Sequence, residues 1–208
     1  MTAPPAPFIP EPLHGTPIVI AFIAHASEDV EAGERAIAPL RALAEPIADM
    51  VRPMTYPEMY MPEEEDYHPT AASWTGFADD IGATEAAAIV ERLGHAAGLM
   101  SAVQLRELGG AVRDVPNDAT AFAHRDRGIM VNVASIYEGD DSPSESWVRE
   151  TRPAVTPDAE AGYVNFFLDE PDRVRAGYPG ATWDRLRRIK ATVDPTNLFH
   201  RNQNIPPA

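Results

Sequence analysis

The residues best suited to chemistry lie near the C-terminal end of the chain. Tyr163 and Asn165 are two positions apart in the apolar run YVNFF, so an extended backbone would direct both side chains to one face. A phenol has a pKa of about 10 and is a poor base at neutral pH unless its surroundings lower that value. In such surroundings a tyrosine can take a proton from a hydroxyl group. The alternative is a core tyrosine whose hydroxyl group is bonded to the backbone.

Three consecutive amides form a second candidate group. Asn202, Gln203 and Asn204 lie between the apolar residues Phe199 and Ile205, and two prolines follow them. Chain ends usually fray, whereas this pattern indicates that the amides form hydrogen bonds to a ligand or to another part of the protein. The alternative is a terminal turn in which the amides satisfy their own backbone.

Motifs of several common site classes do not occur in the sequence. It contains no Gly-x-Gly-x-x-Gly, no Walker-type Gly-Lys-Ser/Thr, no Gly-x-Ser-x-Gly and no His-Glu-x-x-His. The six histidines show no i, i+4 pairing. Residues 63–66 are acidic and are followed by His68, which we interpret as a solvated loop rather than a cation site. No metal site is predicted.

The composition limits the class of protein and its partners. With 208 residues, 44% hydrophobic and 24% charged, the chain fits a globular protein with a sizeable core. Its net charge of −15 would repel a phosphate backbone, so nucleic acid is not an expected partner. The absence of cysteine excludes disulfides, thiolate ligands and a cysteinyl cofactor link within the chain. The N-terminus lacks the layout of a signal peptide, and residues 18–26 are shorter than the ~20 residues of a membrane span. A cytoplasmic location without membrane attachment is expected.

Hydrophobic patterning predicts alternating strands and helices. Ser27 is expected to cap the first helix, whose apolar positions run from Val30 to Leu43. Strands are predicted at residues 17–26, 47–56, 73–78, 101–112, 128–137 and 163–167, and further helices at 80–98, 142–152 and 182–193. Residues 57–70 are expected to form a loop, and residues 194–197 a turn. Because two strands follow one another between residues 101 and 137, antiparallel pairing is favoured. The expected fold class is α+β, a mainly antiparallel sheet with helices packed on one face.

The C-terminal stretch resembles that of the berberine-bridge-enzyme-like family of FAD-linked oxidases. That family ends with a Tyr-x-Asn strand, an Arg-Leu-x-x-Ile-Lys helix, an Asp-Pro-x-Asn-x-Phe turn and a Gln-(Ser/Asn)-Ile-Pro-Pro segment. Here YVN, RLRRIK, DPTNLF and QNIPP occur in the same order within residues 163–207. The segment TAFAHR at 120–125 is similar to the family's Thr-x-Phe-Pro-His-Arg, with Ala123 in place of proline, and GGA at 109–111 resembles its Gly-Gly-Ala strand.

The resemblance implies roles for particular residues. Tyr163 corresponds to the active-site tyrosine beside the flavin, and Asn165 to a position on the cofactor side. The three terminal amides would contact the cofactor or its domain. Expected substrate-binding residues are Arg106, Leu108 and Asn132, although the charged pair Arg106 and Glu107 also fits an exposed strand edge.

Asn132 stands where several plant members carry a carboxylate base, which would leave Tyr163 to act alone. The implied activity is transfer of a hydride from a small alcohol, phenol or sugar to flavin and then to oxygen.

Family members also carry an FAD-binding domain upstream, which is not expected in this chain. Residues 1–16 are predicted to be a Pro-rich linker, 17–160 a substrate-binding α+β domain, and 161–208 the berberine-bridge-like segment that packs on it. FAD is therefore expected only together with that domain, supplied by a partner chain, or the chain forms a homodimer. The alternatives are a non-catalytic dimerisation or ligand-binding module of the family, or a truncated inactive remnant.

Overall fold

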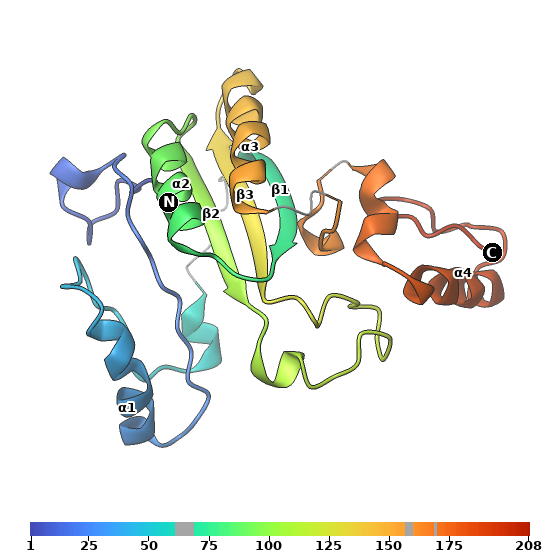
Figure 1. Ribbon diagram of the computed structural model, residues 1–208, viewed down its shortest axis with the longest axis horizontal. Coiled ribbons are helices and arrows are strands. Elements are labelled where there is room, and N and C mark those ends of the chain that lie inside the picture. The colour runs from blue at the N-terminus through green and yellow to red at the C-terminus, as the bar shows by residue number, and fades with distance from the viewer. Residues whose placement is uncertain (61–68, 157–159, 169) are drawn as a thin grey trace.

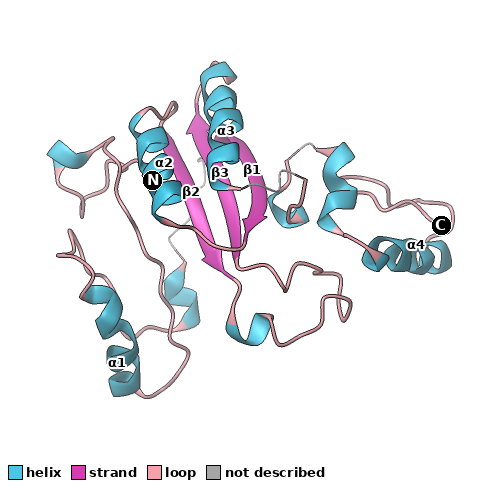
Figure 2. Ribbon diagram, viewed as in Figure 1, coloured by secondary structure: helices cyan, strands magenta, loops and turns pink. Residues whose placement is uncertain are grey.

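The computed structural model describes residues 1–60, 69–156, 160–168 and 170–208 (Figure 1). A sheet with two helices against it forms the centre, and the C-terminal helix stands to one side with the chain end (Figure 2). The helices and strands, in chain order, are α1 (Val30–Arg41), β1 (Thr70–Ala78), α2 (Ala83–Gly94), β2 (Met100–Glu107), β3 (Ile129–Tyr137), α3 (Ser142–Val155) and α4 (Ala181–Val193).

The sheet is antiparallel, and β3 lies between β1 and β2. In its register Val133 pairs with Trp74 on one side and with Val103 on the other. The strands predicted at 73–78 and 128–137 are confirmed. Helices α2 and α3 pack on one face of the sheet, so the predicted α+β class is confirmed as well.

The core lies between the sheet and these two helices. Trp74, Val131 and Val133 point from the sheet toward Trp147 of α3 and Leu93 of α2, and all five are buried. Each such side chain contributes about 1.5–3 kcal/mol when it leaves water. This core fixes one face of the sheet and leaves the other available for a site.

Side chains alternate along the strands, so a second set points away from α2 and α3. We call this side the second face of the sheet. The strand register aligns Gln104 with Asn132 and Thr75 in one row, and Arg106 with Met130 and Phe77 in the next. Two of the predicted substrate-binding residues, Arg106 and Asn132, therefore share this face.

Three predicted strands are wrong. Residues 17–26 and 47–56 have no strand ladder, and Val19 and Phe22 are 94% and 96% exposed. Both runs have strand-like composition, but a strand exists only where a neighbour takes up its backbone hydrogen bonds. Pro17 forms just one isolated bridge, to Thr2.

The third wrong strand is YVNFF. Residues Val164–Phe166 form a short 3-10 helix, in which Phe166 N–H donates to the Tyr163 carbonyl at 2.8 Å and Phe167 N–H to the Val164 carbonyl at 3.1 Å. We call Tyr163–Phe167 the tyrosine turn. Its backbone bonds are made locally, so it cannot also pair in a sheet.

Several predicted ends also shift. Asp29 rather than Ser27 caps α1, because its carboxylate accepts the Ala32 N–H at 2.9 Å. Strand β2 stops at Glu107, whose carboxylate accepts the Gly109 N–H, and a 3-10 turn follows. Helix α2 starts later than predicted, and α3 continues to Val155 with a proline in its last turn.

The predicted loop at 57–70 begins with a short 3-10 helix and ends in β1. Its acidic run with His68 lies outside the described residues. None of the helices in the described ranges is long and apolar enough to cross a membrane. The division of the chain into linker, substrate domain and end segment stays a prediction.

Candidate active site

The tyrosine turn brings the two predicted site residues into contact. Asn165 Nδ2 donates a hydrogen bond to Tyr163 Oη at 3.0 Å. Tyr163 is half-buried and Asn165 exposed. The sequence predicted that both side chains share one face of a strand, whereas in the structure a 3-10 turn brings them together. The amide occupies one lone pair of the phenol oxygen, and the O–H remains available to a further acceptor.

Aromatic rings hold the phenol in a fixed direction. Phe122 meets Tyr163 edge-to-face with ring centroids 5.2 Å apart, and Phe166 lies 5.9 Å from it. His124 lies 5.9 Å from Phe122 and stacks on Phe77 at 4.3 Å. Such pairs contribute about 0.5–1.5 kcal/mol each beyond their buried area. These five residues, the aromatic cluster, join the tyrosine turn to the second face of the sheet.

Arg106 lies at the edge of this cluster. Its guanidinium carbon is 4.8 Å from the centroid of the Phe166 ring, the distance of a cation–π contact. Partial burial lowers the pKa of Arg106 from its usual value, but the group stays protonated at neutral pH. Arg106 of β2, Met130 of β3 and Phe77 of β1 lie in one row across the sheet. Arg106 therefore shares a row with Phe77 of the aromatic cluster and contacts Phe166 of the same cluster. The predicted residues Tyr163, Asn165 and Arg106 are thus brought together.

Arg173 ties the tyrosine turn to the sheet. Its Nη2 donates to the carbonyl oxygens of Thr75 in β1, at 2.8 Å, and of Ala161, at 3.4 Å. Its Nη1 forms an ion pair with Glu170, and its guanidinium lies 4.7 Å from the Phe167 ring. The sequence interpretation missed this residue. The i, i+3 spacing of Glu170 and Arg173 was a local signal for their ion pair. No sequence pattern indicated the contact of Arg173 with β1.

Gly162, which precedes the turn, is required by close packing. A Cβ atom at this position would lie 2.4 Å from the Phe167 ring, closer than real Cβ atoms approach a neighbour. The glycine therefore lets the ring fold back beneath the chain entering Tyr163. The sequence interpretation also missed Gly162, because the requirement for glycine comes from a contact with Phe167 that forms only in the folded chain.

The terminal amides divide into two groups. Gln203 Nε2 donates to the Phe167 carbonyl at 3.5 Å, which links the chain end to the tyrosine turn. Asn204 Oδ1 is buried and has no hydrogen-bond partner in the described part of the chain. Asn202 is exposed and adopts a positive φ of 57°, so it shapes the bend between the other two and α4.

The chain end is held by the turn predicted at 194–197, which is confirmed. Asn197 N–H donates to the Asp194 carbonyl at 3.0 Å. The Asp194 carboxylate accepts the Leu198 and Phe199 N–H groups at 2.8 and 3.1 Å. Lys190 Nζ donates to the same carboxylate and is the main reason that the pKa of Asp194 lies below its usual value. This turn fixes where the amides emerge.

The two other predicted substrate residues have structural partners. Asn132 is buried, and its Nδ2 donates to Ser73 Oγ at 2.9 Å and to the Trp74 carbonyl at 3.2 Å. Leu108 follows β2, and its N–H donates to the Gly128 carbonyl at 2.9 Å. Neither an amide nor an aliphatic side chain can act as a base. The part of Asn132 and Leu108 in substrate binding stays a prediction.

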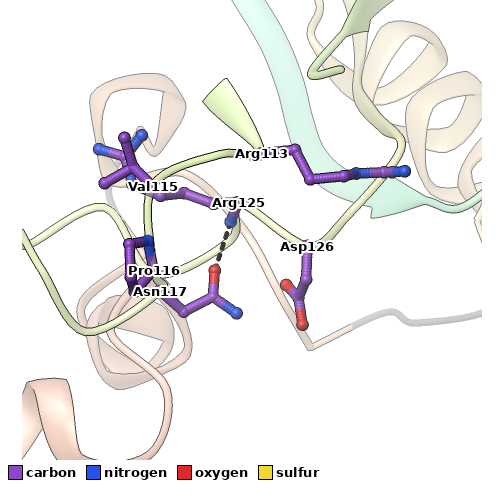
Figure 3. Close-up of a pocket in the computed structure, with 6 residues that line it drawn as sticks. All are labelled: Arg113, Val115, Pro116, Asn117, Arg125 and Asp126. Atoms are coloured by element: carbon purple, nitrogen blue, oxygen red, sulfur yellow. Dashed lines mark hydrogen bonds between the residues drawn. The ribbon is translucent and has the colours of Figure 1, made fainter. Parts of the chain in front are cut away.

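A shallow hollow of about 360 Å³ lies in the loop between β2 and β3 (Figure 3). Asn117 Oδ1 accepts the Arg125 N–H there at 2.7 Å, shown as a dashed line. The Arg125 guanidinium lies 5.4 Å from the Phe122 ring and donates to Thr120 Oγ1 at 3.0 Å. None of the predicted site residues lines this hollow. Arg125, one of the residues that line the hollow, connects it to Phe122 of the aromatic cluster.

The donor set bears on which cofactor could sit against it. Asn165 donates to the phenol, Gln203 donates to the backbone of the tyrosine turn, and the side-chain oxygen of Asn204 has no donor among the described residues. Amide donors and acceptors of this kind suit the polar edge of a flavin ring. The sequence has no glycine-rich phosphate loop of the kinds sought above. The residues present therefore fit the ring and not the dinucleotide part of FAD.

Comparison with known proteins gives one consistent result. The family model described as "Berberine and berberine like" matches residues 162–206. FAD-linked oxidoreductase sorD of Penicillium rubens is 36% identical over 113 residues, which cover 51% of this chain and 24% of that protein. FAD-linked oxidoreductase YgaK of Bacillus subtilis is 33% identical over 117 residues, which cover 55% and 26%.

Among solved structures, that of a glycopeptide hexose oxidase complexed with teicoplanin superposes with a TM-score of 0.67 at 24% identity. The match covers 87% of this chain and 42% of that one. At this identity the similarity concerns the fold. The chain spans about a quarter of the length of the two curated relatives.

Proposed function

We propose that this chain is part of an FAD-linked oxidase of the berberine-bridge-enzyme-like family and forms the substrate side of its active site, with Tyr163 as the base. The observation that supports this role is the hydrogen bond from Asn165 to Tyr163 Oη, 3.0 Å long, inside the aromatic cluster. A tyrosine that served only to fill the core would be fully buried, and Tyr163 is half-buried. Its oxygen is both oriented and accessible.

The proposed chemistry is oxidation of a hydroxyl group. FAD, when bound, supplies the acceptor for the hydride. Tyr163 would act as a phenolate: its Oη takes the proton of the substrate hydroxyl group and becomes a phenol, and the hydrogen bond donated by Asn165 Nδ2 orients that oxygen and stabilises its negative charge. The rings of Phe122 and Phe166 exclude water from the sides of the phenol.

The chain's amides would hold the cofactor ring. Gln203 and Asn204 lie next to the tyrosine turn, and Asn204 Oδ1 needs a donor that the described residues do not supply. The dinucleotide part requires an FAD-binding region outside these 208 residues, carried by the same longer polypeptide or by a partner chain.

An apolar surface beside the amides fits such an interface. Val193, Leu198 and Phe199 are 73%, 70% and 78% exposed at the end of α4. We propose that this surface packs on the FAD-binding region, and a homodimer is the alternative. A soluble monomer at high concentration in size-exclusion chromatography would contradict both.

The proposed substrate is a small organic molecule with an oxidisable hydroxyl group, of the alcohol, phenol or sugar type, and oxygen takes the electrons in the end. The similarity in fold to a hexose oxidase supports the sugar type within this group.

The test is a Tyr163→Phe variant of the chain joined to its FAD-binding region. We expect the rate of flavin reduction under anaerobic conditions to fall by about 10²–10⁴, the usual contribution of a general base. Tyr178→Phe is the matched control. Tyr178 is half-buried, and burial followed by the nearness of Tyr163 raises its pKa, so it stays protonated and should change the rate only a few-fold. Equal rates in the Tyr163 variant and the wild type would remove Tyr163 from this role.

A second candidate, a non-catalytic ligand-binding module of the family, is favoured by Asn132. The Asn132 amide donates two hydrogen bonds within the sheet. An amide cannot act as a base, so the position where plant members carry a carboxylate provides none. Binding of flavin and of a hydroxyl compound without any reduction of the flavin would support this alternative.

A further inference from the structure

Among the described residues, no carboxylate lies against Arg106. Arg41, Arg127 and Arg173, by contrast, each form an ion pair. Arg106 forms no ion pair and no hydrogen bond with any residue in the described ranges. Its contact with Phe166 is the interaction that holds it.

The nearest carboxylate in the sequence is turned away from it. Glu107 points to the opposite side of β2, because side chains alternate along a strand, and its Oε1 accepts the Gly109 N–H at 3.1 Å. This hydrogen bond keeps Glu107 at the strand end. Arg106 is an exposed residue, and packing against Phe166 shields its guanidinium in part, which lowers its pKa. The side of the guanidinium that faces solvent is open to an anion.

Arg106 lies close to the proposed base. The Phe166 ring contacts both residues: its centroid is 4.8 Å from the Arg106 guanidinium carbon and 5.9 Å from the Tyr163 ring centroid. A guanidinium held over a ring directs its N–H groups outward at the edge, which suits a bidentate bond to a carboxylate. Gln104, two positions earlier on the same face, is exposed and adds an amide.

We propose that Arg106 binds a carboxylate group of the substrate, so that the enzyme prefers acidic hydroxy compounds such as sugar acids over their neutral counterparts. The proposal rests on the proposed function, because it assigns the substrate class of the Tyr163 site. The carboxylate on Arg106 and the reacting hydroxyl group at Tyr163 would both lie beside Phe166, whose ring contacts the two residues.

The test compares matched substrates on the FAD-complete protein: D-glucuronate with D-glucose, and 4-(hydroxymethyl)benzoate with benzyl alcohol. We expect a higher kcat/KM for the acidic member of at least one pair. Arg106→Gln should lower that value about 100-fold, mainly through KM, and should change the neutral member less than 3-fold. Arg106→Lys should restore part of the loss. The control is Arg113→Gln, an exposed arginine beside the loop hollow, which should behave as the wild type.

A second measurement separates this inference from the proposed function. The NMR signal of the Arg106 Nε–H group in the full chain is followed during titration with benzoate and with benzyl alcohol. A shift with benzoate alone, together with an enzyme that oxidises no hydroxyl compound, would refute the function and leave the anion site standing. Equal losses on acidic and neutral substrates in Arg106→Gln, or no shift with benzoate, would overturn the proposal.

Discussion

Replacing Arg173 by methionine should loosen the tyrosine turn and lower activity without unfolding the sheet. Methionine keeps most of the length of the side chain and its contact with the Phe167 ring. It removes the hydrogen bonds to the Thr75 and Ala161 carbonyls and the ion pair with Glu170. The variant therefore deletes the link between the turn and β1 together with the contacts of Arg173 to Ala161 and Glu170.

The size of the effect follows from burial. The side chains of Arg173 and Glu170 are 19% and 24% exposed, so both are largely out of water. Breaking a buried pair costs about 3–5 kcal/mol, since the remaining carboxylate loses its partner. Because both groups keep some contact with solvent, we expect the lower end, about 3 kcal/mol. A protein with a typical stability of about 5–15 kcal/mol survives this loss.

Two measurements check the prediction. Urea unfolding gives the stability change, and hydrogen exchange reports the Phe166 and Phe167 amides, whose bonds close the turn. Both amides should exchange faster in Arg173→Met. Arg175→Met is the matched control, because Arg175 lies in the same 3-10 segment and is exposed, and its change should stay within about 0.5 kcal/mol.

In the FAD-complete protein, Arg173→Met should lower kcat about 100-fold, as expected when a reacting group is misplaced by about 1 Å. If Arg173→Met and Arg175→Met have the same stability, exchange and kcat, Arg173 does not position Tyr163.

Two further predictions concern single polar groups. The pKa of Asp194 is lowered in the folded chain, so the stability that this carboxylate gives the C-terminal turn is complete above about pH 4, the usual pKa of an aspartate. This stability is lost as the pH falls through the pKa of the folded state. Hydrogen exchange of the Leu198 and Phe199 amides should show this pH dependence, and it should vanish in Asp194→Asn. Asn132→Asp places a carboxylate against the Trp74 carbonyl oxygen and removes two donated bonds, so it should cost about 1–3 kcal/mol in urea unfolding. The exposed neighbour in the same row, Gln104→Glu, should cost less than about 0.5 kcal/mol, and equal costs would show that the Asn132 bonds are unimportant.

Local patterns predicted the elements that the residues themselves favour. Strands β1 and β3 are mostly buried runs, and α4 follows a helical stripe that ends at a proline-stopped turn. Spacing also predicted that Tyr163 and Asn165 share a face, although through the wrong secondary structure. The pairing of β1 with β3 joins residues far apart in the sequence and was not contained in these patterns.

Other features depend on contacts that spacing does not contain. PIVIAFIAHA has the composition of a central strand, but pairing needs a neighbour, and composition does not say whether one is present. The YVNFF run turns because Gly162 admits the Phe167 ring and Arg173 ties the segment to Thr75, 98 positions away. The aromatic cluster likewise joins Phe77, Phe122 and Tyr163 from three separate segments.

The central claim is that Tyr163 faces a flavin ring and a substrate across one shared space. The most direct measurement is a crystal structure of this chain together with its FAD-binding region, with FAD and a hydroxyl compound bound. We predict Tyr163 Oη within hydrogen-bond reach of the substrate hydroxyl group, and Gln203 and Asn204 against the flavin ring. A phenol packed in hydrocarbon, or terminal amides directed into water away from the ring, would contradict the assignment.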